Sequence, residues 1–435
     1  MRAQRQAVCQ LPLLALARAG VTIAIAGLFM QPSSPQVPPV QHAAQAARTA
    51  GRAALRDALV DAHVATLAAF EAYRAALPGL SVPYRGELNP PLWEIGHVGW
   101  FQEWWVARNP QRARGIAFDE TAPRPGSMLA NADALYDSSR VAHATRWALP
   151  LPTEAGTLEY RARVLETTLA DLNMAEESDA GLYFHRLALF HEDMHNEAAI
   201  YMANGLGFAV GARDFTAAGP QGELAFAAAV HRLGSSGPGF AFDNELAARE
   251  VEVGPFRIDA APVSNARFAA FVEAGGYARR ELWSEAGWAW RVERERQMPR
   301  FWRATDSGWQ QCWFGQWRDL AAHAPVSPLN CHEAEAFCAW AGRRLPREAE
   351  WEHAVLTNPA FAWGQVWEWC AESFEPYPGF APHPYRDYSA PWFGSRRALR
   401  GASIATNARM RHPRYRNFFT LERDDIFAGL RTCAA

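Results

Sequence analysis

The spacing of apolar residues changes at Gly205-Leu-Gly207. Before this point, apolar side chains recur every three or four positions, as the buried face of an amphipathic helix requires. This spacing predicts helices over residues 53–77, 92–107, 157–172 and 183–204. Helices of this length joined by loops are typical of an up-down bundle, which we place at residues 52–207.

The sequence after this junction lacks long helical periods. Gly and Pro interrupt short apolar runs, and 13 of the 18 tryptophans lie beyond residue 280, so large aromatic side chains are concentrated there. Short helices are expected at 331–341 and 346–355. We predict a linker at 208–240 and an irregular α+β domain at 241–435, which makes the fold class α plus α+β.

The first 51 residues have the composition of a leader. Arg2 and Arg5 precede an apolar stretch at 11–30, but Arg18 interrupts it, so the stretch matches neither a secretory signal nor a membrane anchor well. A proline-rich spacer at 31–39 and an Ala-rich region follow. We expect residues 1–51 to be a disordered leader or a mis-assigned start, with an exported protein as the alternative.

The composition excludes several chemistries. All 43 basic residues counted as Lys or Arg are arginine, so neither a Schiff-base lysine nor a phosphate-loop lysine exists. The net charge of −3 gives little support to a nucleic-acid or membrane partner. The cysteines show no paired metal-ligand spacing, which is typical of reduced thiols in a cytoplasmic protein. They are Cys9, Cys312, Cys331, Cys338, Cys370 and Cys433.

The segment His191-Glu-Asp-Met-His195 lies inside the last predicted bundle helix. Residues four apart share one helical face, so both imidazoles can bind one ion. The segment also matches the zinc-protease pattern H-E-x-x-H, in which Glu192 would be the general base. No His follows until His231, and no Glu lies between Glu197 and Glu223. The zinc-protease hypothesis therefore lacks a third ligand.

A third imidazole is available upstream at His97, within Pro90-Pro-Leu-Trp-Glu-Ile-Gly-His97. Histidines on different helices of a bundle commonly form an interior metal site. A site of three neutral imidazoles suits zinc with a water, or iron(II) with open positions for O₂ and a substrate. Spacing alone leaves both metals open.

The chain resembles the ergothioneine-type sulfoxide synthases, iron(II) enzymes that use O₂ to join a sulfur donor to hercynine. The resemblance covers residues 53–435 and implies a DinB-like four-helix bundle followed by a formylglycine-generating-enzyme-like, C-type-lectin-like domain. Besides the histidine segments, the matching motifs are Phe242-Asp-Asn-Glu245, Pro262-Val-Ser-Asn265, Pro325-Val-Ser-Pro-Leu-Asn330, Arg344-Leu-Pro-Arg-Glu-Ala-Glu-Trp351, Val366-Trp-Glu-Trp369, Arg400-Gly-Ala-Ser403, Tyr415-Arg-Asn-Phe-Phe419 and Phe427-Ala-Gly-Leu-Arg431.

The resemblance also implies roles for individual residues. His97, His191 and His195 correspond to the ligands of Fe(2+). Tyr385 corresponds to the catalytic phenol, with Tyr388 beside it, and Asn417 and Phe418 correspond to residues that bind hercynine. Formylglycine generation itself is a poor match, because no cysteine lies between Arg400 and Arg431.

One departure from the family pattern concerns the donor. Enzymes that accept γ-glutamylcysteine carry an arginine pair where this chain has Ala142 and Thr145, and Met194 replaces the usual Gln. Without these arginines a di-anionic peptide would lose its bidentate partners. The segment 136–152 is most similar to the selenoneine-forming branch, which uses a selenosugar. Residues that could contact this neutral donor are Ser138, Ser139, Arg140, His143 and Arg146.

The resemblance therefore implies an iron(II)- and O₂-dependent enzyme that joins hercynine to 1-seleno-glucose and so gives selenoneine. The same-class alternative is a sulfoxide synthase that takes cysteine or another thiol. A non-catalytic, metal-dependent thiol-binding protein of DinB type is the alternative outside that class.

Overall fold

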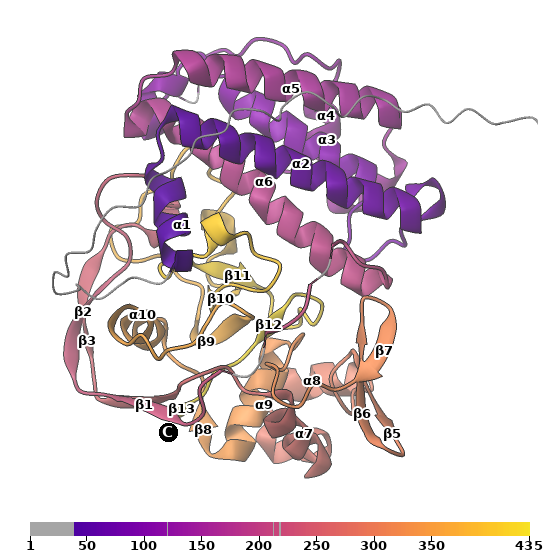
Figure 1. Ribbon diagram of the computed structural model, residues 1–435, viewed down its shortest axis with the longest axis vertical. Helices are drawn as coiled ribbons and strands as arrows, with labels where there is room; N and C mark the ends of the chain where they lie inside the picture. The colour runs from indigo at the N-terminus through magenta and orange to yellow at the C-terminus, as the bar shows by residue number, and fades with distance from the viewer. Residues whose placement is uncertain (1–38, 120, 212, 217–218) are drawn as a thin grey trace, which may run out of the picture. The chain divides into compact units, whose positions relative to one another are not determined.

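The computed structural model describes residues 39–119, 121–211, 213–216 and 219–435, coloured by position along the chain in Figure 1. Most of the predicted leader, residues 1–38 with the apolar stretch and most of the proline-rich spacer, lies outside the described residues. Within the described ranges, no helix is both long enough and apolar enough to cross a lipid bilayer.

Long helices that pack against one another form the first half of the structure (Figure 1). They are α2 (Arg52–Ala76), α3 (Pro91–Gln102), α5 (Glu154–Met174) and α6 (Asp179–Leu206). The predicted helices are thus confirmed, except that α3 continues as a π-helical turn, η2 (Glu103–Ala107). Shorter elements are η1 (Pro78–Leu80), η3 (Arg112–Ala117), α4 (Ala132–Tyr136) and η4 (His143–Ala148).

Local sequence explains the ends of these helices. Thr153 before α5 and Ser178 before α6 each accept a hydrogen bond from the backbone N–H three residues further on. Pro91 occupies the first position of α3, where its missing N–H is not needed. Gly207 ends α6 with a φ of 87°, in the left-handed region that favours glycine.

Short strands in separate sheets make up much of the second half. One sheet has the order β1-β4-β13-β8 and another β11-β10-β9-β12, while β2 pairs with β3 and β5 to β7 form a meander. The strands are β1 (Glu223–Phe226), β2 (Ala229–Leu233), β3 (Arg249–Val253), β4 (Phe256–Asp259), β5 (Trp302–Thr305), β6 (Gly308–Trp313), β7 (Gln316–Asp319), β8 (Arg343–Arg344), β9 (Trp367–Ser373), β10 (Arg397–Gly401), β11 (Asn417–Phe419), β12 (Ala428–Gly429) and β13 (Cys433–Ala434).

Helices and single turns connect these strands. They are η5 (Asp243–Glu245), α7 (Asn265–Glu273), η6 (Gly276–Ala278), η7 (Arg280–Leu282), α8 (Glu285–Glu293), α9 (Cys331–Ala341), α10 (Glu348–Thr357), η8 (Ala390–Trp392) and η9 (Ala408–Met410). Helix α9 has the predicted bounds, set by a capping box of Asn330 and Glu333. Helix α10 begins two residues later than predicted, because Arg347 is its N-cap and its N–H donates to Glu350.

Two segments outside the predicted domains are structured. Residues 39–49, in the expected leader, form helix α1 (Pro39–Thr49), and the buried guanidinium of Arg48 pairs with Glu245 at 2.6 Å. Within the expected linker, β1 pairs with β4 and β2 pairs with β3. Both segments are held by partners distant in the sequence, so local composition gave no sign of them.

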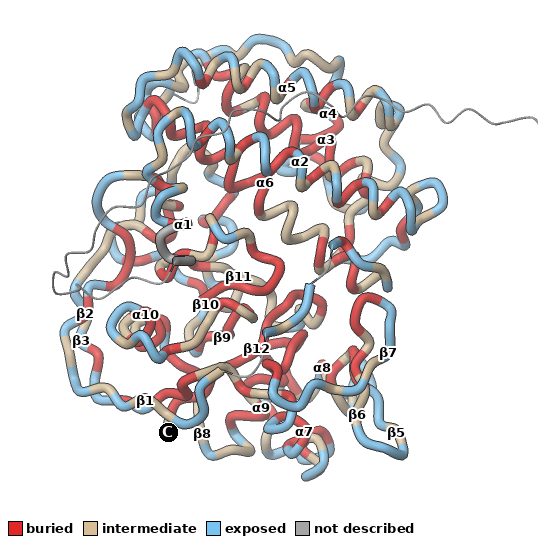
Figure 2. Tube along the Cα trace, in the orientation of Figure 1, coloured by how far each residue is buried: buried red, intermediate tan, exposed pale blue. Residues whose placement is uncertain are grey.

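Helix α6 is joined to the second half by two carboxylates. Asp193 forms a bidentate pair with Arg409 at 2.6 and 2.8 Å. One turn later, Glu197 accepts hydrogen bonds from Trp367 at 2.7 Å and Ser403 at 2.6 Å. Buried side chains of both halves belong to one hydrophobic cluster, and Figure 2 shows α3 and much of α6 in red.

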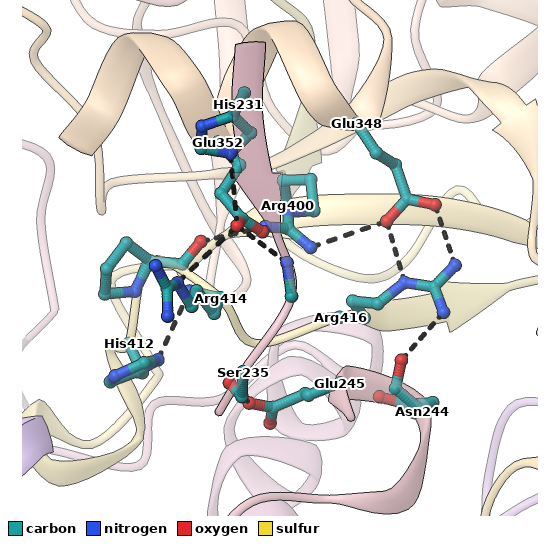
Figure 3. Close-up of polar contacts among 12 residues, drawn as sticks. His231, Ser235, Asn244, Glu245, Glu348, Glu352, Arg400, His412, Arg414 and Arg416 are labelled. Atoms are coloured by element: carbon teal, nitrogen blue, oxygen red, sulfur yellow. Dashed lines mark hydrogen bonds and ion pairs between the residues drawn. The ribbon is translucent and has the colours of Figure 1, made fainter. Parts of the chain in front are cut away.

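A buried network of arginines and glutamates holds the second half together (Figure 3). Arg416 binds Glu348 through two hydrogen bonds of 2.8 Å, and Arg400 lies 3.4 Å from Glu348 and in short contact with Glu352. These side chains are at most 7% exposed. Each buried charge therefore has a partner, which is the condition for burying it.

Substituting Glu348 with Ala is expected to lower the free energy of unfolding by about 3–5 kcal/mol, because Arg416 would lose, while buried, the one carboxylate partner that it has among the described residues. Urea denaturation measures this change. Glu71→Ala is the control, because it breaks an exposed pair with Arg74 and should leave the unfolding midpoint unaltered. Equal midpoints for the two variants would contradict this role of Glu348.

Candidate metal centre

His97 lies in α3 and is held in one orientation. Its Nδ1 lies 2.8 Å from the backbone oxygen of Tyr136, so Nδ1 carries the proton and Nε2 keeps its lone pair. Gly96 allows this contact, because a Cβ there would lie 2.3 Å from the Tyr136 ring. One turn earlier, Trp93 stacks on the His97 imidazole with a centroid distance of 4.8 Å.

The structure brings His97 together with His191 and His195 of α6. One nitrogen from each imidazole lies within 4.8 Å of the other two. Among the described residues, no other group of His, Cys, Asp or Glu side chains meets this condition. His191 stacks on Phe101 at a centroid distance of 3.5 Å, and its buried Nδ1 has no hydrogen-bond partner in the part of the chain that the structure describes.

Burial keeps His97 and His191 neutral. Burial first, and then the neighbouring His195, lower the pKa of His97 to about 3. The same causes, in the same order, hold the pKa of His191 well below its usual value. Two buried imidazoles with free lone pairs and a third beside them are a donor set that suits zinc or iron(II).

Glu94 binds the third imidazole. Its Oε2 lies 2.6 Å from Nδ1 of His195, and its side chain is 13% exposed. Burial alone would raise the pKa of Glu94, but His195, then His97 and the amide of Asn89 outweigh it and lower the pKa to about 2. Sequence reasoning missed Glu94, although a carboxylate three residues before His97 in the same motif was a usable signal.

Glu192, the general base of the zinc-protease reading, is held away from this role. Its carboxylate accepts a hydrogen bond of 2.6 Å from Thr66 of α2 and is in short contact with Arg161 of α5. Both partners belong to the interior of the helical half. The donor set therefore consists of three imidazole nitrogens. Three ligands leave coordination positions open on a bound metal.

Tyr385 lies beside the histidine cluster. Its ring is 4.8 Å from that of Phe101 and 6.1 Å from that of His191, measured between centroids. Burial, and then the charges of Asp387 and Asp137, raise the pKa of Tyr385, so the phenol is protonated at neutral pH. No hydrogen bond of its hydroxyl is present among the described residues, which leaves this group available to a ligand.

Tyr388 lies further from the histidines and has its own partner. Its hydroxyl donates to the hydroxyl of Tyr415 at 3.1 Å, and that of Tyr415 lies 3.4 Å from the sulfur of Met194. Burial first and Tyr415 next raise the pKa of Tyr388. The ring of Tyr388 lies 5.9 Å from that of Tyr385, so the two tyrosines form one aromatic wall.

Asn417 and Phe418 lie in β11, which pairs with β10. The ring of Phe418 lies 5.9 Å from that of Tyr388 and stacks on Phe374 at 4.2 Å. The amide oxygen of Asn417 accepts from the N–H of Phe418 at 2.9 Å, whereas Nδ2 has no partner among the described residues. The rings of His191, Tyr385, Tyr388 and Phe418 therefore follow one another at about 6 Å.

The structure does not bring the predicted donor residues to one point. Arg140 is 78% exposed and lies 3.2 Å from Asp137. His143 binds the backbone oxygen of Leu88 at 2.8 Å, and Arg146 donates to Asn89 at 2.8 Å. Sequence reasoning missed these last two contacts, which join η4 to the residues just before α3.

A family model described as a sulfatase-modifying factor enzyme 1-like domain matches residues 219–359. The formylglycine-generating enzyme of Streptomyces coelicolor is 28% identical over 258 residues, which cover 42% of this chain and 76% of that protein. These matches confirm the predicted formylglycine-generating-enzyme-like domain in the second half of the chain.

Several relatives match both halves. Hercynine oxygenase of Mycolicibacterium thermoresistibile is 31% identical over 437 residues, covering 87% of this chain and 94% of the relative. Hercynine oxygenase of Mycolicibacterium smegmatis is 30% identical over 413 residues, covering 80% and 91%. Similarity of this extent confirms the predicted family resemblance: the chain belongs to the hercynine oxygenase family.

Proposed function

We propose that this protein is an iron(II)- and O₂-dependent enzyme that forms a carbon–selenium bond between hercynine and a selenosugar, 1-seleno-glucose. O₂ is the oxidant and the product is an oxidised selenosugar conjugate, which gives selenoneine once its selenium–sugar bond is broken. The observation that supports this proposal most is the convergence of His97, His191 and His195 beside Tyr385. The relatives that match both halves are hercynine oxygenases, which supports hercynine as the acceptor.

In this proposal the imidazoles of His97, His191 and His195 hold the iron. Bound iron(II) would supply the redox chemistry with O₂ and a positive charge that favours the deprotonated donor. Phe101, stacked on His191, excludes water from that side. The raised pKa of Tyr385 keeps the proton on its hydroxyl oxygen at neutral pH. Because this hydroxyl has no hydrogen-bond partner among the described residues, it would be the group that donates to the reacting atoms.

Asn417 and Phe418 would bind hercynine. Nδ2 of Asn417, which has no partner within the described ranges, can donate to a carboxylate, directly or through water. The aromatic faces of Phe418 and Tyr388 attract a quaternary ammonium such as the trimethylated amine of hercynine. Tyr388 would contribute its ring and not its hydroxyl, because the hydroxyl already donates a hydrogen bond to Tyr415.

The donor assignment is supported by what stands at 142 and 145. Ala142 and Thr145 are exposed and uncharged, so they offer no bidentate partner to a peptide carboxylate. Of the predicted donor residues, Arg140 keeps its guanidinium open to solvent, whereas His143 and Arg146 bind Leu88 and Asn89. We assign the sugar contact to Arg140.

We also propose the division of the chain into a DinB-like bundle at 52–207, a linker at 208–240 and a formylglycine-generating-enzyme-like domain at 241–435. The mutual packing of α2, α3, α5 and α6 supports the first part. Helix α1 and strands β1 and β2 lie outside these two domains and attach to the second.

Removal of the metal tests the centre itself. Anaerobically prepared protein should bind one Fe(2+) per chain, and chelation should abolish O₂ consumption in the presence of hercynine and donor. His195→Ala should lose both properties, whereas His323→Ala, which changes an exposed histidine, should keep them. Stoichiometric zinc together with peptide cleavage would contradict the proposal.

Tyr385→Phe removes the hydroxyl and keeps the ring. Product formation should fall about 100-fold or more, the usual contribution of a general acid, while the KM for hercynine changes little. Steady-state kinetics separates the two quantities. Tyr84→Phe is the control because that ring is 62% exposed. An unchanged kcat for Tyr385→Phe would exclude a role in proton transfer.

Competition between donors tests the selenium assignment. The enzyme, supplied with hercynine, iron and O₂, receives equal concentrations of selenosugar and cysteine, and mass spectrometry identifies the product. We expect the selenosugar conjugate to dominate. A strong preference for cysteine would identify the chain as a sulfoxide synthase instead, and no consumption of either donor would favour the binding-protein alternative.

A further inference from the structure

Arg146 in η4 has partners that lead toward the metal centre. Its Nη1 donates to Oδ1 of Asn89 at 2.8 Å, and Nδ2 of Asn89 donates to Oε1 of Glu94 at 2.5 Å. The other oxygen of Glu94, Oε2, lies 2.6 Å from Nδ1 of His195. An unbroken series of hydrogen bonds thus runs from a surface segment to one of the imidazoles.

The direction of every bond in this series follows from its first member. A guanidinium can only donate hydrogen bonds, so the side chain of Asn89 must turn its oxygen toward Arg146. Its NH₂ group then faces Glu94 and donates to that carboxylate. A carboxylate with one oxygen engaged in this way accepts on the other, so Nδ1 of His195 carries the proton and Nε2 is left with a lone pair.

A second contact of Arg146 leads to another imidazole. The guanidinium carbon lies 3.9 Å from the centroid of the Trp93 ring, and Trp93 stacks on His97 at 4.8 Å with an angle of 6° between the planes. His143, three residues before Arg146, binds the backbone oxygen of Leu88. Element η4 therefore holds the residues just before α3, the helix that carries both Glu94 and His97.

We propose that Arg146 is a positioning residue of the metal centre: through Asn89 and Glu94 it fixes the proton and the orientation of His195, and through Trp93 it fixes the ring plane of His97. The inference rests on the proposed function, because it assumes that these imidazoles bind a metal. It gives Arg146 a role in metal affinity in place of the donor contact expected from sequence. Partners that orient a metal-bound imidazole commonly change affinity about 10–100-fold when they are removed.

The test measures metal binding by protein from which metal has been removed by chelation. Co²⁺ is the probe, because its visible absorption reports the geometry of its ligands and its binding needs neither O₂ nor substrate. Arg146→Met should weaken Co²⁺ binding about 10-fold and shift the absorption bands. Asn89→Leu, which interrupts the hydrogen bonds and leaves the contact of Arg146 with Trp93, should weaken binding in the same direction.

Arg124→Met is the matched control. Arg124 also lies over a tryptophan of the same region, 4.3 Å from the centroid of Trp104, but it has no hydrogen bond to Asn89 or Glu94. Its Co²⁺ affinity and spectrum should equal those of the unaltered protein. In the double variant of Arg146→Met and Asn89→Leu, the fold-loss of Co²⁺ affinity should be smaller than the product of the two single fold-losses, because both substitutions act through Glu94.

The outcomes separate this inference from the proposed function. Unaltered Co²⁺ affinity and spectrum in both Arg146→Met and Asn89→Leu, with binding lost in His195→Ala, would overturn the positioning role and leave the metal centre standing. Unaltered binding in His195→Ala would overturn the centre itself. Should Arg146→Met fail to fold, as judged by circular dichroism, the Co²⁺ affinity of Asn89→Leu alone tests the positioning role.

Discussion

Helix α6 is the element on which the rest of the arrangement depends, because it is held from two sides. His191 and His195 lie one turn apart, and Asp193 and Glu197 also lie one turn apart. The carboxylate pair is displaced from the histidine pair by two residues and therefore by about 200° around the helix axis. The histidines face His97 of α3, while the carboxylates bind Arg409, Trp367 and Ser403 of the second half. The second half thus fixes the rotation of the helix that presents two of the three imidazoles.

The burial of α6 changes the pKa values of the carboxylates and imidazoles on its two sides. Burial raises the pKa of Asp193 to about 6 even though Arg409 opposes the rise. Burial likewise raises the pKa of Glu197. Opposite these carboxylates, burial keeps His97 and His191 neutral. The imidazoles thereby stay available as nitrogen donors, and the polar contacts that close the structure lie on the other side of the same helix.

Apolar periodicity predicted the local part of this structure from sequence. The bundle helices and α9 could be predicted because the interactions that form a helix act within a few residues, as the capping box of Asn330 and Glu333 in the structure illustrates. The contact of Arg48 with Glu245 spans 197 positions, so no local pattern reveals it. The motif that contains Glu94 and His97 places a carboxylate near the site, but the contact of Glu94 with His195 spans 101 positions, so the motif does not identify its partner. The contacts of His143 with Leu88 and of Arg146 with Asn89 span 55 and 57 positions, so local patterns do not reveal them either.

The most direct test of the account is a crystal structure of anaerobically grown, iron-loaded protein with hercynine, using anomalous scattering at the iron edge. We predict one anomalous peak about 2.1 Å from a nitrogen of each of His97, His191 and His195. Hercynine should lie between that peak and the aromatic rings of Tyr385, Tyr388 and Phe418. An iron peak elsewhere, or hercynine bound away from this wall, would contradict the account.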